Sequence, residues 1–348
     1  MKILITGNQG YIGTKLTEYF FKNTKYKICG LDAGYFKKCI TNDNYKKLRF
    51  KQIYKDIRTI KKDDLNEVDT IIHLASISND PIGNEFKQIT NEINLQASKK
   101  LFKLALNSNV KKFVFASSCS IYGASGKQKK KEINLLKPLT AYAKSKVKFE
   151  EYLKKKSSKN LKSVILRFAT ACGESDRMRL DLVINDFVTK AFLFKKIILL
   201  SKGTSYRPFI STNDMCRSIH WASNYQSKKN VEIVNAGSDK MNFKISDLAK
   251  TIAKKIKGTK IYINENAKRD KRTYRVDFSK FKKLSGKYYP KDNLESVIKG
   301  ILQQCRKSSK IKLLKEKNFY SSNLIRLSYL KKLLKRRKLN NDFYYSIK

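Results

Sequence analysis

An α/β fold of the Rossmann type is predicted, in which a doubly wound parallel sheet is followed by a smaller C-terminal lobe. Strand candidates alternate with helical spacing in the first half of the 348-residue chain, and this alternation is typical of a parallel sheet with helices on both faces. Several candidates are nearly continuous apolar runs, as expected when both sheet faces are covered. A glycine-rich turn directly follows the first of them.

The strand candidates are the runs at 2–6, 26–32, 48–54, 69–75, 111–117 and 162–168. Helical spacing of apolar residues occurs between them at 11–23, 85–108 and 141–156. Beyond residue 170 we expect helices at 180–194, 212–225, 245–256 and 293–305, with short strands near 197–200, 231–234 and 260–263. The predicted parts are a Rossmann domain at 1–170, a lobe at 171–305 that partly shares the sheet, and a basic, partly helical extension at 306–348.

The chain is strongly basic, with 77 Lys and Arg against 29 Asp and Glu and a net charge of +48. Such an excess would favour polyanions such as nucleic acid or anionic lipid. The lysines are nevertheless spread along the whole length, which favours compositional drift at exposed positions over a specific nucleic-acid contact. Only residues 306–348 are denser in cations, with Glu316 and Asp342 as the two acids.

Cysteine spacing and apolar runs argue against several other classes. The six cysteines lie far apart without a C-x-x-C pair, and the chain has two histidines, so neither a zinc site nor a disulfide framework is expected. The N-terminal apolar run is too short for a signal peptide. No stretch reaches the roughly 18 apolar residues of a membrane span. A cytoplasmic protein without a metal is expected.

The turn TGNQGYIG after the first strand is predicted to bind a dinucleotide pyrophosphate. Gly7, Gly10 and Gly13 allow a close backbone approach, and the following helix presents its positive end to the anion. Asp32 ends the second strand, where a carboxylate would accept from a ribose hydroxyl and repel a 2′-phosphate, so NAD is predicted over NADP. The cofactor-binding candidates are Gly7, Gly10, Tyr11, Ile12, Gly13, Asp32, Asp56, Ile57, Leu74, Ala75, Ser76, Tyr142, Lys146 and Phe168.

Tyr142 and Lys146 in the stretch TAYAKSK are four residues apart, which places them on one face of a helix. A solvated helix face in a lysine-rich chain would show the same spacing. The alternative is a proton-transfer pair in which the ammonium lowers the pKa of the phenol.

Together with HLAS (73–76), SSCSIYG (117–123), SNDPIGNEF (78–86) and YRPFISTND (206–214), these motifs resemble the extended short-chain dehydrogenase/reductases. Within them the chain is similar to the NAD-dependent epimerase/dehydratase family that acts on nucleotide-diphosphate sugars, over roughly residues 1–305. The resemblance implies a nicotinamide cofactor, a substrate-binding C-terminal lobe and a homodimer formed through the helices at 85–108 and 141–156.

The resemblance also implies catalytic roles for Ser118, Tyr142 and Lys146. Tyr142 would take a proton from a sugar hydroxyl while hydride leaves to the nicotinamide, and Ser118 would hold the same oxygen. Because tyrosine ionises near pH ~10, bringing its pKa to neutral pH needs roughly 4 kcal/mol. The Lys146 ammonium and the positive nicotinamide ring are expected to supply this.

The reaction that follows oxidation at the sugar's fourth carbon depends on other residues. Family 4,6-dehydratases carry an Asp-Glu pair directly after the catalytic hydroxyl, where this chain has Cys119 and Ser120. A reductase of the fucose-synthase type has its reactive cysteine two residues before the position of Tyr122, whereas Cys119 lies three before it. His220 is expected to pack rather than to react. Reversible 4-epimerisation through a transient 4-keto sugar needs neither pair and is therefore favoured, with 4,6-dehydration and 4-keto reduction as alternatives.

The substrate-binding candidates are Ser118, Cys119, Thr170, Asn185, Arg207 and Arg272. Arg207 matches an arginine that grips the substrate diphosphate in the family. Arg177 and Arg179 are weaker candidates for the same surface.

A second alternative is an NAD-binding protein without catalysis, or one associated with polyanions or membranes through its tail. Leucines recur near one face of a predicted helix at 324–338, with cations elsewhere. Basic amphipathic helices can lie on anionic membranes. Docking of this helix on its own domain or on a second subunit is favoured.

Overall fold

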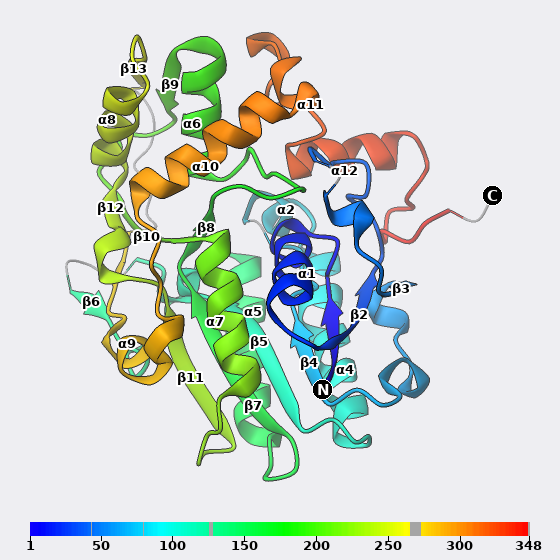
Figure 1. Cartoon of the computed structure of the whole chain (residues 1–348). Helices are drawn as coiled ribbons and strands as arrows, with labels where there is room; N and C mark the ends of the chain where they lie inside the picture. Colours follow the sequence, from blue (N-terminus) through cyan, green and yellow to red (C-terminus); the bar gives the residue numbers. More distant parts are fainter. Residues whose placement is uncertain (43, 79, 125–127, 265–272, 347–348) are drawn as a thin grey trace.

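The computed structural model describes residues 1–42, 44–78, 80–124, 128–264 and 273–346, and its centre is a seven-stranded parallel sheet (Figure 1). The strand order is β11-β7-β5-β4-β1-β2-β3. These strands are β1 (Lys2–Thr6), β2 (Lys27–Asp32), β3 (Lys51–Tyr54), β4 (Thr70–His73), β5 (Lys112–Ser118), β7 (Lys162–Phe168) and β11 (Val231–Ala236). The predicted α/β Rossmann-type fold is confirmed.

Helices cover both faces of the sheet, so the strands bury side chains on both sides. Ile3 and Ile5 of β1 belong to the core under α1 (Tyr11–Asn23) and α7 (Thr212–Asn224). Leu4 points the other way, into the core under α4 (Ala97–Leu106) and α5 (Ala141–Lys156). This two-sided burial explains why the strands are continuous apolar runs in the sequence.

The segment 85–108 differs from the single helix that its apolar spacing predicts. It is divided into the end of α2 (Asp80–Glu85), α3 (Lys87–Asn91), a π-helical turn (Glu92–Gln96) and α4. Within the turn, the side chain of Asn94 bonds both backbone groups of Ile77, donating to its carbonyl and accepting from its N–H. The Asn94 side chain therefore connects the π-helical turn to the loop after β4. Apolar spacing in the sequence does not reveal such a tertiary contact.

The second half of the chain builds smaller sheets and also returns to the main one. Short strands pair as β12-β10-β8, β13-β9 and β14-β6. Their bounds are β6 (Lys129–Lys130), β8 (Thr170–Cys172), β9 (Lys196–Leu199), β10 (Tyr206–Ser211), β12 (Asn242–Lys244), β13 (Lys260–Ile263) and β14 (Arg275–Val276). The other helices are α6 (Val183–Phe194), α8 (Ile245–Lys255), α9 (Ser279–Ser285), α10 (Leu294–Lys307), α11 (Ser309–Lys312) and α12 (Arg326–Lys335). Since β11 extends the main sheet, the sheet is shared by both halves.

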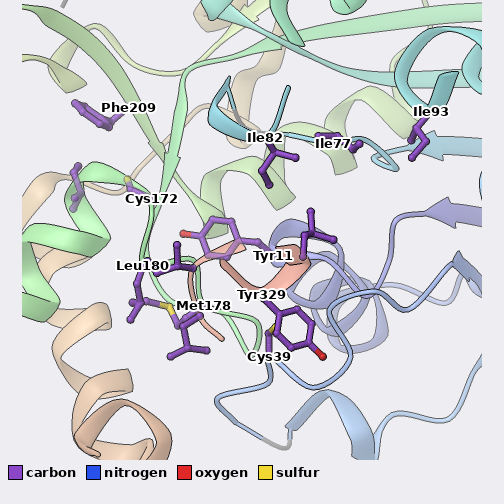
Figure 2. Close-up of a cluster of buried hydrophobic side chains, with 14 of the residues drawn as sticks. Tyr11, Cys39, Ile77, Ile82, Ile93, Cys172, Met178, Leu180, Phe209 and Tyr329 are labelled. Carbon is purple, nitrogen blue, oxygen red and sulfur yellow. The ribbon is translucent and has the colours of Figure 1, made fainter. Parts of the chain in front are cut away.

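The C-terminal extension packs on the chain itself. Leu324, Leu330 and Leu333 are buried, and Leu327 and Leu334 pack against the same core. Figure 2 shows Tyr329 of α12 beside Cys39 of the N-terminal half. The apolar face of α12 is therefore covered by protein, which contradicts the alternative in which it lies on a membrane. Among the described residues, no helix has the length and apolarity needed to cross a bilayer.

A buried ion pair links α5 to β7. Arg167 Nη2 lies 2.7 Å from Glu150 Oε2, and both side chains are 1% exposed. Arg167 also donates to Tyr122 Oη at 3.0 Å and to the carbonyl of Glu132 at 2.9 Å. Removing one partner of such a pair leaves a buried charge without its counterion.

Replacing Glu150 by Gln should therefore lower the free energy of unfolding by about 3 kcal/mol. Urea denaturation of Glu150→Gln and of Glu151→Gln, which neutralises the exposed neighbour, measures the effect. The control should change stability by no more than about 0.5 kcal/mol. Equal small changes in both variants would contradict the importance of the pair.

Candidate active site

A cavity of about 680 Å³ lies over the carboxyl ends of the central strands, a size typical of ligand sites. All of the predicted cofactor-binding residues, from Gly7 to Phe168, line it. Of the predicted substrate contacts, Ser118, Thr170 and Arg207 also line it. Parallel strands bring these positions together because their carboxyl ends meet at one edge of the sheet.

The glycine turn has no space for side chains. A Cβ on Gly13 would lie 2.2 Å from the carbonyl oxygen of Gly7, and one on Gly7 would lie 2.7 Å from the Ala75 nitrogen. Gly7 also adopts φ +75°. Gly10 precedes α1 without a side-chain cap. The first turn of α1 thus offers backbone N–H groups and a positive helix end at the cavity, which fits a dinucleotide pyrophosphate.

Asp32 ends β2 at the cavity and holds the turn in place. Its carboxylate accepts from the backbone N–H of Gln9 at 3.0 Å and of Gly34 at 2.7 Å. Burial raises the pKa of Asp32, while these two N–H bonds oppose the increase. Each oxygen keeps acceptor capacity, so the carboxylate can still receive a ribose hydroxyl.

Asp56 lines the cavity, but the chain already occupies its carboxylate. One oxygen accepts from the backbone N–H and Nε of Arg58, and the other accepts from Arg58 Nη2 and Tyr35 Oη, all within 3.0 Å. These donors match the four acceptor positions of a carboxylate. A contact between Asp56 and an adenine amino group, as predicted, would have to replace one of them.

Ser118, Tyr142 and Lys146 meet at the junction of β5 and α5. Thr140 caps α5 by accepting from the Ala143 N–H at 3.1 Å, so Tyr142 lies in the first helical turn. Its hydroxyl is hydrogen-bonded to the Ser118 side chain. The Lys146 ammonium lies 5.5 Å from the centre of the Tyr142 ring and donates to the Ala116 carbonyl at 2.8 Å.

The electrostatics of the pair differ from the expectation. Burial, and then the charge of Asp80, raise the pKa of Tyr142, although the Ser118 hydrogen bond and Arg179 oppose this. Burial also lowers the pKa of Lys146 to about 7, against the opposing effect of Glu150. The chain alone therefore does not lower the phenol pKa, because its ammonium is buried, partly neutral and directed at Ala116. An additional positive charge near the phenol would lower its pKa.

The structure contradicts two predicted substrate contacts. Cys119 is fully buried in the core and its thiol contacts the Arg167 carbonyl oxygen at 3.1 Å, since its side chain points away from the cavity. Asn185 is also fully buried, and its amide bonds Gly173, Tyr11 and Arg179. Each is used to hold the protein together. Arg272 lies outside the described residues.

Of the remaining predicted positions, Arg207 and Arg179 line the cavity, whereas Arg177 and His220 do not. Arg207 lies over the Tyr274 ring, with 5.2 Å from its Cζ to the ring centre. Arg179 pairs with Asp181 at 2.6 Å. Arg177 donates to Gln9 Oε1 at 3.3 Å, so it lies by the glycine turn. His220 packs among the rings of Tyr19, Phe20, Tyr26 and Tyr288.

Sequence reasoning missed several residues that line the cavity. Asp80 approaches Tyr142 and accepts from the Thr140 hydroxyl at 2.7 Å. Asp80 belongs to the stretch SNDPIGNEF, which was part of the family resemblance, so this motif could have indicated its place at the cavity. Tyr320, Arg326, Leu330 and Phe343 come from the C-terminal extension. These four residues are distant in sequence from the glycine turn, so no local sequence pattern predicts that they line the cavity.

Comparisons with known proteins agree with this geometry. A sequence model of the NAD dependent epimerase/dehydratase family matches residues 3–237. The uncharacterized UDP-glucose epimerase YtcB of Bacillus subtilis is 32% identical over 229 residues, covering 63% of this chain and 71% of that protein. A dTDP-D-glucose 4,6-dehydratase of Dictyostelium discoideum is 30% identical over 280 residues, covering 73% and 61%.

A solved structure is also similar. The UDP-glucuronic acid 4-epimerase of Bacillus cereus, in complex with UDP-glucuronic acid and NAD, superposes with a TM-score of 0.76 at 25% identity. The match covers 88% of this chain and 99% of that one.

The lowered pKa of Lys146 predicts a pH dependence of stability. Above about pH 7 the folded state has lost a proton that the unfolded chain keeps up to about pH 10.5, so the unfolded state binds more protons in this window. Lys146 should therefore raise the free energy of unfolding by up to about 1.4 kcal/mol for each pH unit within this window. Urea midpoints between pH 7.5 and 9.5 should rise more steeply in the unsubstituted protein than in Lys146→Met.

Lys144→Met removes an exposed lysine from the same helix and should keep the slope of the unsubstituted protein. Identical slopes for all three proteins would show that Lys146 titrates normally.

Proposed function

Because the chain belongs to the NAD dependent epimerase/dehydratase family, we propose that this enzyme is a nucleotide-sugar 4-epimerase. It would invert the sugar's fourth carbon through a transient 4-keto sugar. The observation that carries this proposal is the meeting of Ser118, Tyr142 and Lys146 at a cavity lined by a glycine turn. Structures of family relatives bound to NAD and a nucleotide sugar support the same ligands here.

When bound, NAD would accept hydride from the fourth carbon and return it to the other face of the ketone. The glycine turn and Asp32 would hold the dinucleotide. Tyr142 would remove the hydroxyl proton and later return it, while Ser118 would hold the oxygen. Arg207 would bind the substrate diphosphate. The raised pKa of Tyr142 means that proton removal would await the positive charge of the oxidised cofactor.

The residues after Ser118 support epimerisation over dehydration. Elimination of water needs an acid and a base near the sixth carbon. Cys119 is buried in the core, and Ser120 Oγ accepts from Ser118 Oγ at 2.9 Å. Neither side chain is a carboxyl group that could perform this step.

One observation favours a second candidate, 4,6-dehydration. Asp80 lines the cavity and its charge acts on Tyr142, so a carboxylate reaches the reacting end from α2. If Asp80 abstracts a proton after oxidation, Asp80→Asn would abolish product formation while leaving NAD binding intact. For an epimerase, the same variant should keep turnover, because inversion needs no further base. A homodimer formed through the segments 85–108 and 141–156 is also proposed from the family resemblance.

Incubation with UDP-glucose, UDP-galactose and UDP-glucuronic acid, followed by mass spectrometry and proton NMR, tests the proposal. We expect a product of unchanged mass that is inverted at the fourth carbon. Tyr142→Phe should lower turnover at least about 100-fold, because proton transfer contributes this much, while NAD binding persists.

Tyr152→Phe makes the same change on the same helix, where the ring stacks on Phe149, and should leave turnover unchanged. A product lighter by one water would establish dehydration instead. Full turnover by Tyr142→Phe would refute the assigned chemistry.

A further inference from the structure

The C-terminal extension contributes a buried cation to the cofactor end of the cavity. Arg326 is the first residue of α12 and lines the cavity, with 4% of its side chain exposed. Its Nη1 has no hydrogen-bond partner among the described residues. Burial lowers the pKa of Arg326 to about 10, so the guanidinium remains charged at neutral pH. A buried charge whose donor lacks a partner favours a nearby anion.

The surroundings hold this guanidinium in one orientation. Its Cζ lies 4.0 Å above the centre of the Phe36 ring, a cation–π contact. Nη2 donates to the Arg177 carbonyl at 3.4 Å. Nη1 is left without a hydrogen-bond partner in the part of the chain that the structure describes. The positive N-terminal end of α12 lies at the same place.

Arg177 is a second buried arginine next to Arg326. It is 3% exposed, donates to the Phe36 carbonyl and to Gln9, and has an Nε without a partner. Arg179 is paired with Asp181, but within the described ranges neither Arg177 nor Arg326 forms an ion pair with a carboxylate. Both buried guanidinium groups thus have a nitrogen without a hydrogen-bond partner within those ranges, and Arg326 is the one of the two that lines the cavity.

The position of these cations identifies the kind of anion. Gln9 belongs to the glycine turn, and Phe36 lies in the loop after Asp32. Arg326 is close enough to Asp32 to oppose the rise of its pKa. Arg326 therefore lines the cavity near both the phosphate cradle and the ribose acceptor. A diphosphate joined to a ribose would occupy that place, and guanidinium groups bind phosphate oxygens well.

The extension is fixed on the cavity rim by further contacts. Leu324 accepts from the Leu180 N–H at 3.3 Å. The Phe343 carbonyl accepts from Tyr35 Oη at 2.6 Å, and the Asp342 carbonyl accepts from Arg58 Nη1 at 2.7 Å. Phe343 is fully buried and its ring packs on Phe86. Figure 1 shows the chain passing from α12 beside the loops of β2 and β3.

We propose that Arg326, supplied by the C-terminal extension, binds the pyrophosphate of the dinucleotide from the side opposite the glycine turn. This inference rests on the dinucleotide binding of the proposed function. The extension is then a part of the cofactor site, and residues 306–348 are needed for affinity.

Calorimetric titration of the full-length, cofactor-free protein tests this with NAD, ADP, adenosine, NADP and UDP. Arg326→Gln should weaken NAD and ADP at least about tenfold, and leave adenosine and UDP unchanged. Arg336→Gln removes an exposed cation from the same extension and should change no affinity by more than about twofold. Arg326→Lys, which keeps the charge but not the fork, should fall between.

The outcomes separate the alternatives. If Arg326→Gln lowers the affinity for adenosine as much as that for ADP, Arg326 only packs. A loss of affinity confined to NADP would identify a contact with the 2′-phosphate. A loss of affinity for UDP would assign Arg326 to the substrate site. Each would overturn the inference. If Arg326→Gln does not fold by circular dichroism, unchanged NAD affinity in a folded Arg326→Lys overturns it and a weakened one supports it. An unsubstituted protein that binds no dinucleotide would instead contradict the proposed function.

Discussion

The burial of one lysine side chain, Lys146, is the constraint on which the rest of this enzyme depends. Lys146 is buried near Tyr142, where the Ala116 carbonyl, the Phe115 ring and the more distant Glu150 compensate its charge. Burial therefore weakens its ability to stay protonated and also keeps the Tyr142 phenol neutral. Without a cofactor, the protein therefore favours a neutral phenol at Tyr142 and a partly deprotonated amine at Lys146. An oxidised cofactor adds the positive charge that changes this balance.

The parallel sheet makes this arrangement possible. Strands β1, β2, β4, β5 and β7 end at one edge and deliver the glycine turn, Asp32, Ser76, Ser118 and Phe168 to a single cavity. The Glu150–Arg167 pair then fixes α5 to β7 and so fixes the helix that carries Tyr142 and Lys146. The stability of the fold and the geometry of the site thus both depend on α5, because the helix that carries Tyr142 and Lys146 also carries Glu150 of the buried ion pair.

Features with local causes could be predicted from the sequence. The strands at 2–6 and 162–168 and the helices at 11–23 and 141–156 agree with the structure to the residue, because continuous apolar runs, a glycine turn and a Thr cap define them. The side-chain directions of Cys119 and Asn185 could not be predicted, since the core around each is formed by distant residues. The position of Arg326 depends on contacts between residues separated by about 150 to 300 positions, for which sequence spacing carries no signal.

In the proposed mechanism, the cofactor's charge rather than the chain alone prepares Tyr142 for proton transfer. Carbon-13 NMR of the ring carbon bearing the hydroxyl, assigned by comparison with Tyr142→Phe, can follow this titration directly. Without NAD+, the Tyr142 resonance should show no titration below pH 10. With NAD+ bound, its midpoint should move toward neutral pH. A midpoint that is unchanged or higher in the presence of NAD+ would contradict the account.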